Sequence, residues 1–282
     1  MLPNPNGTAP GLHLIHDNRH IFCLPGPPSE LYPMFEASVL PVLRQLSAGT
    51  PPLHQKVLRL IGLGESLVQE KAEAVLRSLG SIDIGYCARR GEVDLRLITR
   101  DPALLTRAAA CARDIFGSAV YAEDDETMEQ TVIRLATAQN LKIATAESCT
   151  GGLIAHRLTN IPGASAVFLQ GWVTYSNASK TSLLDVDPAL LERYGSVSPE
   201  TASAMAQGAL RHSGADLAVS VTGIAGPSGG SPEKPLGTVH FGLATRKTCT
   251  THAKLLVPGR EVFKTMASQF ALDLLRRALM QF

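Results

Sequence analysis

Short apolar runs and longer amphipathic stretches alternate between residues 51 and 122. Short apolar runs predict strands, and apolar positions spaced three or four apart predict helices. The strands are expected at 56–61, 82–87, 93–99 and 119–122, and the helices at 65–79 and 102–116. This β-α-β-β-α-β order is typical of a small split βαβ domain.

The pattern changes after an acidic run at 123–126, and residues 123–282 are expected to form a second α/β domain. Strands are predicted at 142–146, 167–175, 217–222, 238–244 and 250–257, and helices at 128–140, 153–159, 199–212 and 261–280. Ser198 before Pro199 predicts an N-cap followed by proline at the first helical position. Strands interleaved with helices imply a layered α/β domain with a mixed sheet.

Residues 1–50 are rich in proline and glycine and carry one predicted strand, at 20–24, and one helix. We expect Ser29 to be the N-cap of that helix, because its hydroxyl can accept a hydrogen bond from the helix start. One strand and one helix cannot bury much apolar surface. We interpret the segment as the end of a domain whose body is absent, or as an arm that packs on another subunit, and we expect a homo-oligomer.

Composition and charge exclude several classes of protein. Hydrophobic side chains make up 45% of the 282 residues, and 26 basic against 25 acidic side chains leave a net charge of +1. This near-neutral balance argues against nucleic acid as a partner of the whole protein. No apolar run approaches the ~18 residues that a membrane helix needs, and the first residues lack the features of a signal peptide. We expect no membrane association.

The cysteines and histidines indicate a reducing compartment and no resident metal. The five cysteines are scattered and form no Cys-x-x-Cys pair, and no His-Glu-x-x-His motif occurs. Disulfides and structural zinc are therefore not expected. The prediction is a cytoplasmic protein that uses neither a metal nor another cofactor.

Three strand ends carry turns of glycine and hydroxyl residues, at the edge where ligands bind in α/β sheets. In chain order these turns contain Ser148 with Thr150 and Gly151, Tyr175 with Lys180, and Thr222 with Gly223. Free backbone N–H groups at a helix start can hold a phosphate or an oxyanion. Small polar residues also cap helices without any ligand, but three such turns at one edge outline a pocket.

Ser148 and Cys149 are the competing nucleophiles of the first turn. Ser148 does not lie in a Gly-x-Ser-x-Gly elbow, and the sequence places no histidine as a base for either residue. Lys180 is the better base for Ser148, but a neutral amine requires its pKa to fall from ~10.4 to ~7.5. An apolar pocket floor would supply that desolvation. The alternative is a solvated lysine at a helix start.

These turns resemble the motifs of the CinA family, which occur here in the family's order. The matching segments are 146–152, 162–165, 173–180, 223–227 and 235–239, with 2–11 and 24–30 near the start. The resemblance identifies 123–282 as an amidohydrolase domain and 51–122 as a KH-like middle domain. It identifies 1–50 as the last part of a domain similar to molybdopterin-binding proteins.

The resemblance implies a specific reaction, the deamidation of nicotinamide mononucleotide to nicotinate mononucleotide and ammonia through a serine acyl-enzyme, without metal. It implies Ser148 as the nucleophile, Lys180 as its general base and Tyr175 as a supporting catalytic residue. The substrate-binding positions that it implies are Ser165, Thr222, Gly223, Thr150, Gly151 and Arg260. The expected partner is therefore a small-molecule nucleotide.

Two other functions stay open from the sequence. The family is named for competence and DNA damage, so a member that lacks most of its first domain could be an adaptor that keeps a nucleotide pocket without chemistry. It could also be an amidase for another nucleotide carboxamide. Ammonia release from nicotinamide mononucleotide separates the adaptor from the enzyme, and a substrate panel separates the two enzymes.

Overall fold

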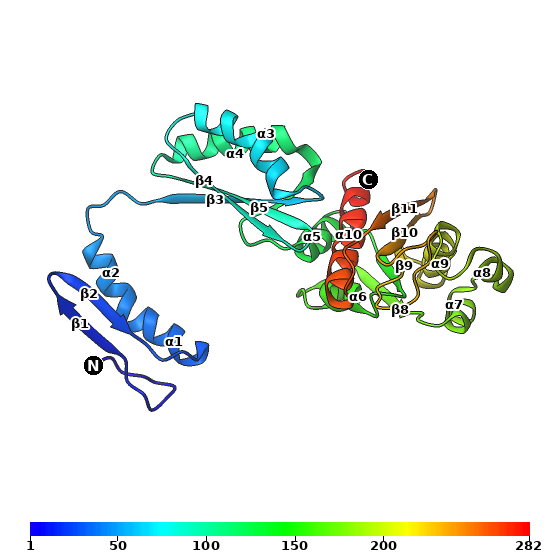
Figure 1. Cartoon of the computed structure of the whole chain (residues 1–282), viewed down its shortest axis with the longest axis horizontal. Helices are drawn as coiled ribbons and strands as arrows, with labels where there is room; N and C mark the ends of the chain where they lie inside the picture. Colours follow the sequence, from blue (N-terminus) through cyan, green and yellow to red (C-terminus); the bar gives the residue numbers. More distant parts are fainter. The chain divides into compact units, whose positions relative to one another are not determined.

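The first 53 residues form a unit of their own in the computed structural model, which describes residues 1–282. This unit, drawn in blue in Figure 1, consists of a hairpin of β1 (Leu12–His16) and β2 (Arg19–Cys23), then α1 (Pro28–Met34), a π-helical turn (Phe35–Val39) and α2 (Leu40–Leu46). Its buried hydrophobic side chains are those of Met34 and Val39. As expected, such a short segment buries little.

Ser29 is not the N-cap that the sequence predicted. With Ser29 as N-cap the helix would begin at Glu30, but α1 begins two residues earlier, at Pro28, and Pro27 occupies the cap position without a side-chain hydrogen bond. The reason is that proline fixes φ near the helical value and lacks the N–H group that the first helical position leaves unpaired. Ser29 therefore lies inside the first turn of the helix.

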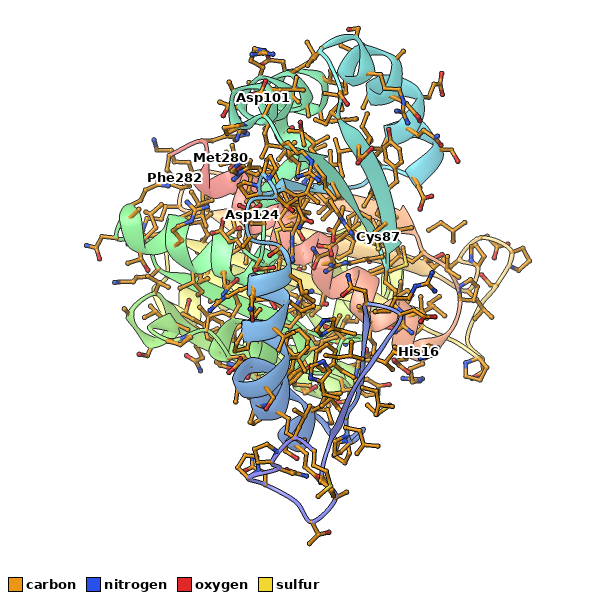
Figure 2. The ribbon with its side chains drawn as sticks, turned by 90° about the vertical axis from the view of Figure 1, so that its left-hand side faces the viewer. His16, Cys87, Asp101, Asp124, Met280 and Phe282 are labelled. Atoms are coloured by element: carbon orange, nitrogen blue, oxygen red, sulfur yellow. The ribbon has the colours of Figure 1, made fainter.

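Residues 54–123 form a four-stranded antiparallel sheet with two helices, which confirms the β-α-β-β-α-β order. The elements are β3 (His54–Ile61), α3 (Glu65–Ser78), β4 (Asp83–Arg89), β5 (Glu92–Thr99), α4 (Pro102–Phe116) and β6 (Val120–Glu123). The strand order is β4-β5-β3-β6. Asp101, labelled in Figure 2, caps α4 by accepting a hydrogen bond from the amide of Ala103 at 2.8 Å.

A separate five-stranded sheet organises the rest of the chain. Its strands are β7 (Ile143–Glu147), β8 (Phe168–Val173), β9 (Leu217–Gly223), β10 (Thr238–Thr245) and β11 (Cys249–Leu255). The helices are α5 (Met128–Ala138), α6 (Leu153–Thr159), α7 (Asn177–Leu184), α8 (Pro188–Tyr194), α9 (Pro199–Ser213) and α10 (Arg260–Leu279). The order is β11-β10-β9-β7-β8. Strand β7 is parallel to β8 and β9, and β10 is antiparallel to β9 and β11, which confirms the predicted mixed sheet.

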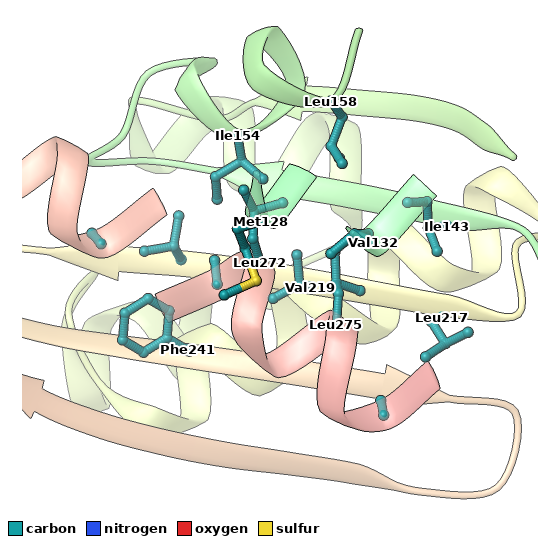
Figure 3. Close-up of a cluster of buried hydrophobic side chains, with 14 of the residues drawn as sticks. Met128, Val132, Ile143, Ile154, Leu158, Leu217, Val219, Phe241, Leu272 and Leu275 are labelled. Carbon is teal, nitrogen blue, oxygen red and sulfur yellow. The ribbon is translucent and has the colours of Figure 1, made fainter. Parts of the chain in front are cut away.

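Large side chains fill the space between this sheet and the helices α5, α6 and α10 (Figure 3). Leu217 and Val219 of β9 and Phe241 of β10 belong to the same buried cluster as Leu272 and Leu275 of α10. Each of these side chains is at most 1% exposed. This cluster is the main hydrophobic core of the molecule.

The opposite face of the sheet carries small side chains, because α9 lies directly on it. Ala144 of β7 and Ala218 of β9 pack in one buried cluster with Met205 of α9. A Cβ atom at Gly242 would lie 2.3 Å from the carbonyl oxygen of Ala202, so this approach requires glycine. Because successive strand residues point to opposite faces, this pattern of large and small residues favours the register in which Ile143 pairs with Leu217 and Glu147 with Val221.

Buried polar contacts join α10 to residues 54–123. Arg276, 1% exposed, donates to the carbonyl oxygen of Ser118 at 2.7 Å and to the carboxylate of Asp273 at 2.7 Å. Gln269 of the same helix donates to Glu92. These contacts hold the helix that begins at Arg260. Neither α10, the longest helix at 20 residues, nor any other helix has the length and the apolar composition that a membrane span needs.

Candidate active site

The carboxyl ends of β7, β8 and β9 lie side by side, and hydrogen bonds tie the residues that follow them. The amide of Ser148, directly after β7, donates to the carbonyl oxygen of Val221 at 3.0 Å, and the amide of Thr174 donates to that of Glu147 at 2.7 Å. A pocket of about 410 Å³ opens beside these strand ends, with Ser148 in its wall. This is the edge at which ligands bind in open α/β sheets.

Glu147 shapes the turn that presents Ser148. Its side chain is 1% exposed, and its carboxylate accepts hydrogen bonds from the amides of Gly152 at 3.0 Å, Ile154 at 3.1 Å and Ala155 at 2.8 Å. A carboxylate at a helix start satisfies amides that have no partner within the helix. Glu147 therefore fixes residues 148–152 between β7 and α6.

Lys180 reaches Ser148 from α7, and both side chains are buried. The helix begins at a capping box in which the amide of Ser179 donates to Ser176 Oγ at 3.1 Å. Lys180, only 1% exposed, places Nζ 2.8 Å from the carbonyl oxygen of Thr174 and 3.1 Å from Ser148 Oγ. Burial lowers the pKa of Lys180, because desolvation disfavours its ammonium form. The geometry thus favours the neutral amine that a general base requires.

Cys149 follows Ser148 but is held in an unreactive form. Its thiol is buried, and burial raises the pKa of Cys149 to about 12. Only the thiolate is a strong nucleophile, and a free cysteine already has a pKa of about 8.5. Cys149 therefore stays protonated at neutral pH, whereas the hydroxyl of Ser148 lies 3.1 Å from the Lys180 amine.

Tyr175 and Arg260 form the mouth of the pocket. Tyr175 is 61% exposed, and its hydroxyl accepts a hydrogen bond from Arg260 Nη1 at 3.1 Å. Arg260 Nη2 donates to the carbonyl oxygen of Gly226 at 3.2 Å. Deeper in the pocket, the buried hydroxyl of Thr222 donates to the carbonyl oxygen of Ser196 at 2.6 Å. Both partners of the guanidinium are neutral, so its charge is available for an anionic ligand.

Two family models match the chain. The CinA C-terminal domain matches residues 125–279, and the damage-inducible protein CinA KH domain matches residues 55–122. The chain belongs to the CinA family. These matches confirm the resemblance that the motifs around Ser148, Lys180 and Thr222 indicated.

Relatives in the CinA family cover nearly the whole chain. A CinA-like protein of Akkermansia muciniphila is 48% identical over 275 residues, which are 96% of this chain and 66% of that protein. A putative competence-damage inducible protein of Caldicellulosiruptor bescii is 42% identical over 288 residues, which cover 100% of this chain and 70% of that protein. The chain therefore spans about two-thirds of the length of these relatives.

Solved structures of CinA-type proteins share the α/β architecture. The competence/damage inducible protein CihA from Agrobacterium tumefaciens is 45% identical, with a TM-score of 0.53, over 55% of this chain and 94% of that chain. A CinA superfamily protein from Klebsiella pneumoniae is 31% identical, with a TM-score of 0.52, over 56% of this chain and 100% of that chain. The fold class predicted from the sequence is thus confirmed.

The pocket wall contains most of the residues that the CinA resemblance implied. These are Ser148, Lys180, Tyr175, Thr222, Gly223 and Arg260. Thr150 and Gly151 follow Ser148 and are not among the residues that line the pocket, so their binding of substrate stays a prediction. The side chain of Thr150 is fully buried, and Gly151 adopts a positive φ in the turn. Both therefore shape the turn that carries Ser148.

Ser165 lies at the edge of the sheet opposite Ser148, and its binding of substrate stays a prediction. Strands β7 and β8 are parallel, and Phe168 at the start of β8 pairs with Ile143 at the start of β7. Ser165 precedes Phe168, whereas Ser148 follows the end of β7. The five residues of β7 separate these edges by about 17 Å, at ~3.3 Å per residue. Ser165 therefore cannot contact Ser148 within one chain.

Sequence reasoning missed three residues of the site. Glu147 orders the turn, Ser196 accepts the hydrogen bond of Thr222, and Lys234 lines the pocket. The position of Glu147, an acidic residue between a predicted strand and the start of a predicted helix, could have indicated its role. Lys234 ends a glycine- and serine-rich stretch, where no local pattern indicates which way a side chain points. No group of three or more His, Cys, Asp or Glu side chains is arranged to hold a metal ion.

Proposed function

We propose that the protein is an amidohydrolase that converts nicotinamide mononucleotide to nicotinate mononucleotide and ammonia. The observation that carries this proposal is the 3.1 Å contact between Lys180 Nζ and Ser148 Oγ in the wall of the pocket. A serine hydroxyl becomes a nucleophile when an adjacent base takes its proton. The choice of substrate rests on the CinA resemblance and on the cation at the pocket mouth, Arg260.

In the first half of the reaction, neutral Lys180 takes the proton of Ser148 while the serine oxygen attacks the carboxamide carbon. The amides of Cys149 and Thr150 donate to no backbone carbonyl and lie against the Cys149 sulfur. As the nearest donors in sequence, they would turn to the oxyanion that forms. The C–N bond then breaks, and the Lys180 ammonium returns its proton to the departing amine, which leaves as ammonia. Ser148 now carries the acyl group as an ester.

In the second half, Lys180 is neutral again and removes a proton from a water molecule. The hydroxide adds to the ester carbon, and the bond to Ser148 Oγ breaks as Lys180 protonates that oxygen. The carboxylic acid product leaves as its carboxylate. In this mechanism one amine transfers a proton at every step, so a Ser–Lys pair is sufficient and no catalytic triad is needed.

The experiment that tests this function is a substrate panel with purified protein. Nicotinamide mononucleotide, nicotinamide riboside, free nicotinamide and other nucleotide carboxamides are each incubated with the protein, and ammonia is measured. We expect the mononucleotide to be hydrolysed with the highest kcat/KM. Binding of the mononucleotide without ammonia release would support the adaptor function instead, and preference for another nucleotide carboxamide would support a different amidase.

The rate should rise with pH through the pKa of Lys180, because the neutral amine is the active form. Burial places this pKa below the ordinary lysine value of 10.5. At pH values between the lowered pKa of Lys180 in the folded protein and its ordinary pKa in the unfolded chain, the folded protein binds fewer protons. The free energy of unfolding therefore also rises with pH in that range. The pH profile of kcat/KM measures the first effect, with urea unfolding at each pH as the control. A profile that does not rise with pH would contradict the role of Lys180.

Replacing Cys149 with alanine should leave kcat within about threefold of the wild-type value, since the protonated thiol performs no chemistry. The free energy of unfolding should fall by about 1 kcal/mol, because a small buried side chain is lost. Ammonia release and urea unfolding measure the two effects. A loss of activity as large as that of a Ser148 variant, in a folded protein, would reassign the nucleophile to Cys149.

A further inference from the structure

The pocket is lined by basic side chains and by no carboxylate. Its basic residues are Lys180, Lys234 and Arg260, and no Asp or Glu is part of its wall. Burial keeps Lys180 toward its neutral form, which leaves Lys234 and Arg260 as the two cations. A wall of this kind favours a ligand with more than one negative charge, such as a phosphate monoester.

Lys234 and Arg260 hold opposite ends of the loop 226–235. Lys234 Nζ donates to the carbonyl oxygen of Tyr194 at 2.8 Å, and Arg260 Nη2 donates to that of Gly226 at 3.2 Å. The loop turns back on itself before Lys234, whose amide donates to Ser231 Oγ at 3.1 Å. Neither cation is paired with a carboxylate. Backbone carbonyls are neutral, so a phosphate would be a stronger partner for both.

We infer that Lys234 binds the phosphate of the substrate together with Arg260, and that it makes the pocket selective for nucleotides over nucleosides. This inference rests on the proposed function and deepens it. Ser228, Gly229 and Ser231 of the same loop also line the pocket and supply hydroxyl and amide groups of the kind that bind phosphate. With the phosphate held by the loop 226–235, we expect the carboxamide at the other end of the substrate to lie at Ser148.

The test compares two substrates and a matched set of lysine variants. Lys234→Gln removes the charge, Lys234→Arg keeps it, and Lys247→Gln removes a charge from the exposed turn between β10 and β11. For Lys234→Gln we expect the KM for nicotinamide mononucleotide to rise about tenfold to a hundredfold with kcat nearly unchanged, as for loss of a charge-assisted hydrogen bond. The kcat/KM for nicotinamide riboside should not change. Lys234→Arg should keep most of the affinity, and Lys247→Gln all of it.

Two outcomes would overturn the inference. One is an equal loss for both substrates in Lys234→Gln, which would mean that Lys234 only anchors the loop to Tyr194. The other is no change for either substrate. Binding measurements separate this inference from the proposed function, because they need no catalysis. The dissociation constants of nicotinamide mononucleotide and of nicotinamide riboside are measured for Ser148→Ala and for the double variant of Ser148→Ala and Lys234→Gln. Phosphate-dependent binding that needs Lys234 would support the inference even if the wild-type protein released no ammonia.

Discussion

Replacing Ser148 with alanine is expected to lower the rate of ammonia release from nicotinamide mononucleotide by at least about a thousandfold. The reason is that alanine lacks the oxygen that attacks the carboxamide and carries the acyl group. The dissociation constant of the substrate should change little, since Arg260 and the loop 226–235 are left intact. Ammonia release and equilibrium binding measure the two effects.

The matched control for this variant is Ser182→Ala, which removes an exposed hydroxyl from α7, the helix that carries Lys180. It should keep wild-type kcat and KM. Turnover near the wild-type value in Ser148→Ala would reject Ser148 as the nucleophile. The next variant to measure would then be the double replacement of Ser148 and Cys149.

Replacing Lys180 with methionine should lower kcat by about a hundredfold to ten-thousandfold, the usual contribution of a general base. Methionine has a similar length and suits a site that is 1% exposed, so the fold should be kept. The free energy of unfolding should stay equal or rise. The reason is that burying the Lys180 amine costs its hydration, and methionine does not have this cost. Lys180→Arg should be as inactive as Lys180→Met, since guanidinium stays charged at any working pH.

Lys247→Met, on an exposed turn, is the control for the loss of a lysine. Both kcat and urea unfolding are measured for each variant, so that a loss of activity is not confused with a loss of fold. A folded Lys180→Met that keeps more than about a tenth of the wild-type kcat would exclude Lys180 as the base. The Ser148–Lys180 contact would then be only structural.

Most of the fold could be predicted from the sequence, because hydrophobic periodicity is a local property. The β-α-β-β-α-β order of 54–123 and the strands β7, β9 and β10 follow from apolar runs that the buried sheet requires. Helices α7 and α8 were not predicted, because their residues show no clear apolar period. The observed start of α1 lies two residues before the predicted one, because Pro28 at the first helical position decides it rather than Ser29 at the cap.

The convergence of Ser148 and Thr222 was predictable for a topological reason. Both follow or end parallel strands, and the carboxyl ends of neighbouring parallel strands meet at one edge. The same rule places Ser165 at the other edge, because it precedes its strand. The motif match alone did not reveal this difference in position.

The burial of Lys180 and the use of Lys234 could not be predicted from the sequence. Each depends on contacts between residues far apart in the chain, such as Lys180 with Ser148 and Lys234 with Tyr194. A lysine at a helix start or in a glycine-rich loop is normally solvated, and only the packing of α7 and the loop 226–235 changes that. The chemistry of this site is therefore a property of tertiary structure.

The central claim, that Ser148 forms an acyl-enzyme, is tested most directly by hydroxylamine partitioning. The wild-type protein is incubated with nicotinamide mononucleotide and increasing hydroxylamine, and the acid and hydroxamate products are measured together. An ester on Ser148 is open to attack by either water or hydroxylamine, so we expect hydroxamate to form at the expense of nicotinate mononucleotide. Formation of the acid alone at every hydroxylamine concentration would contradict it.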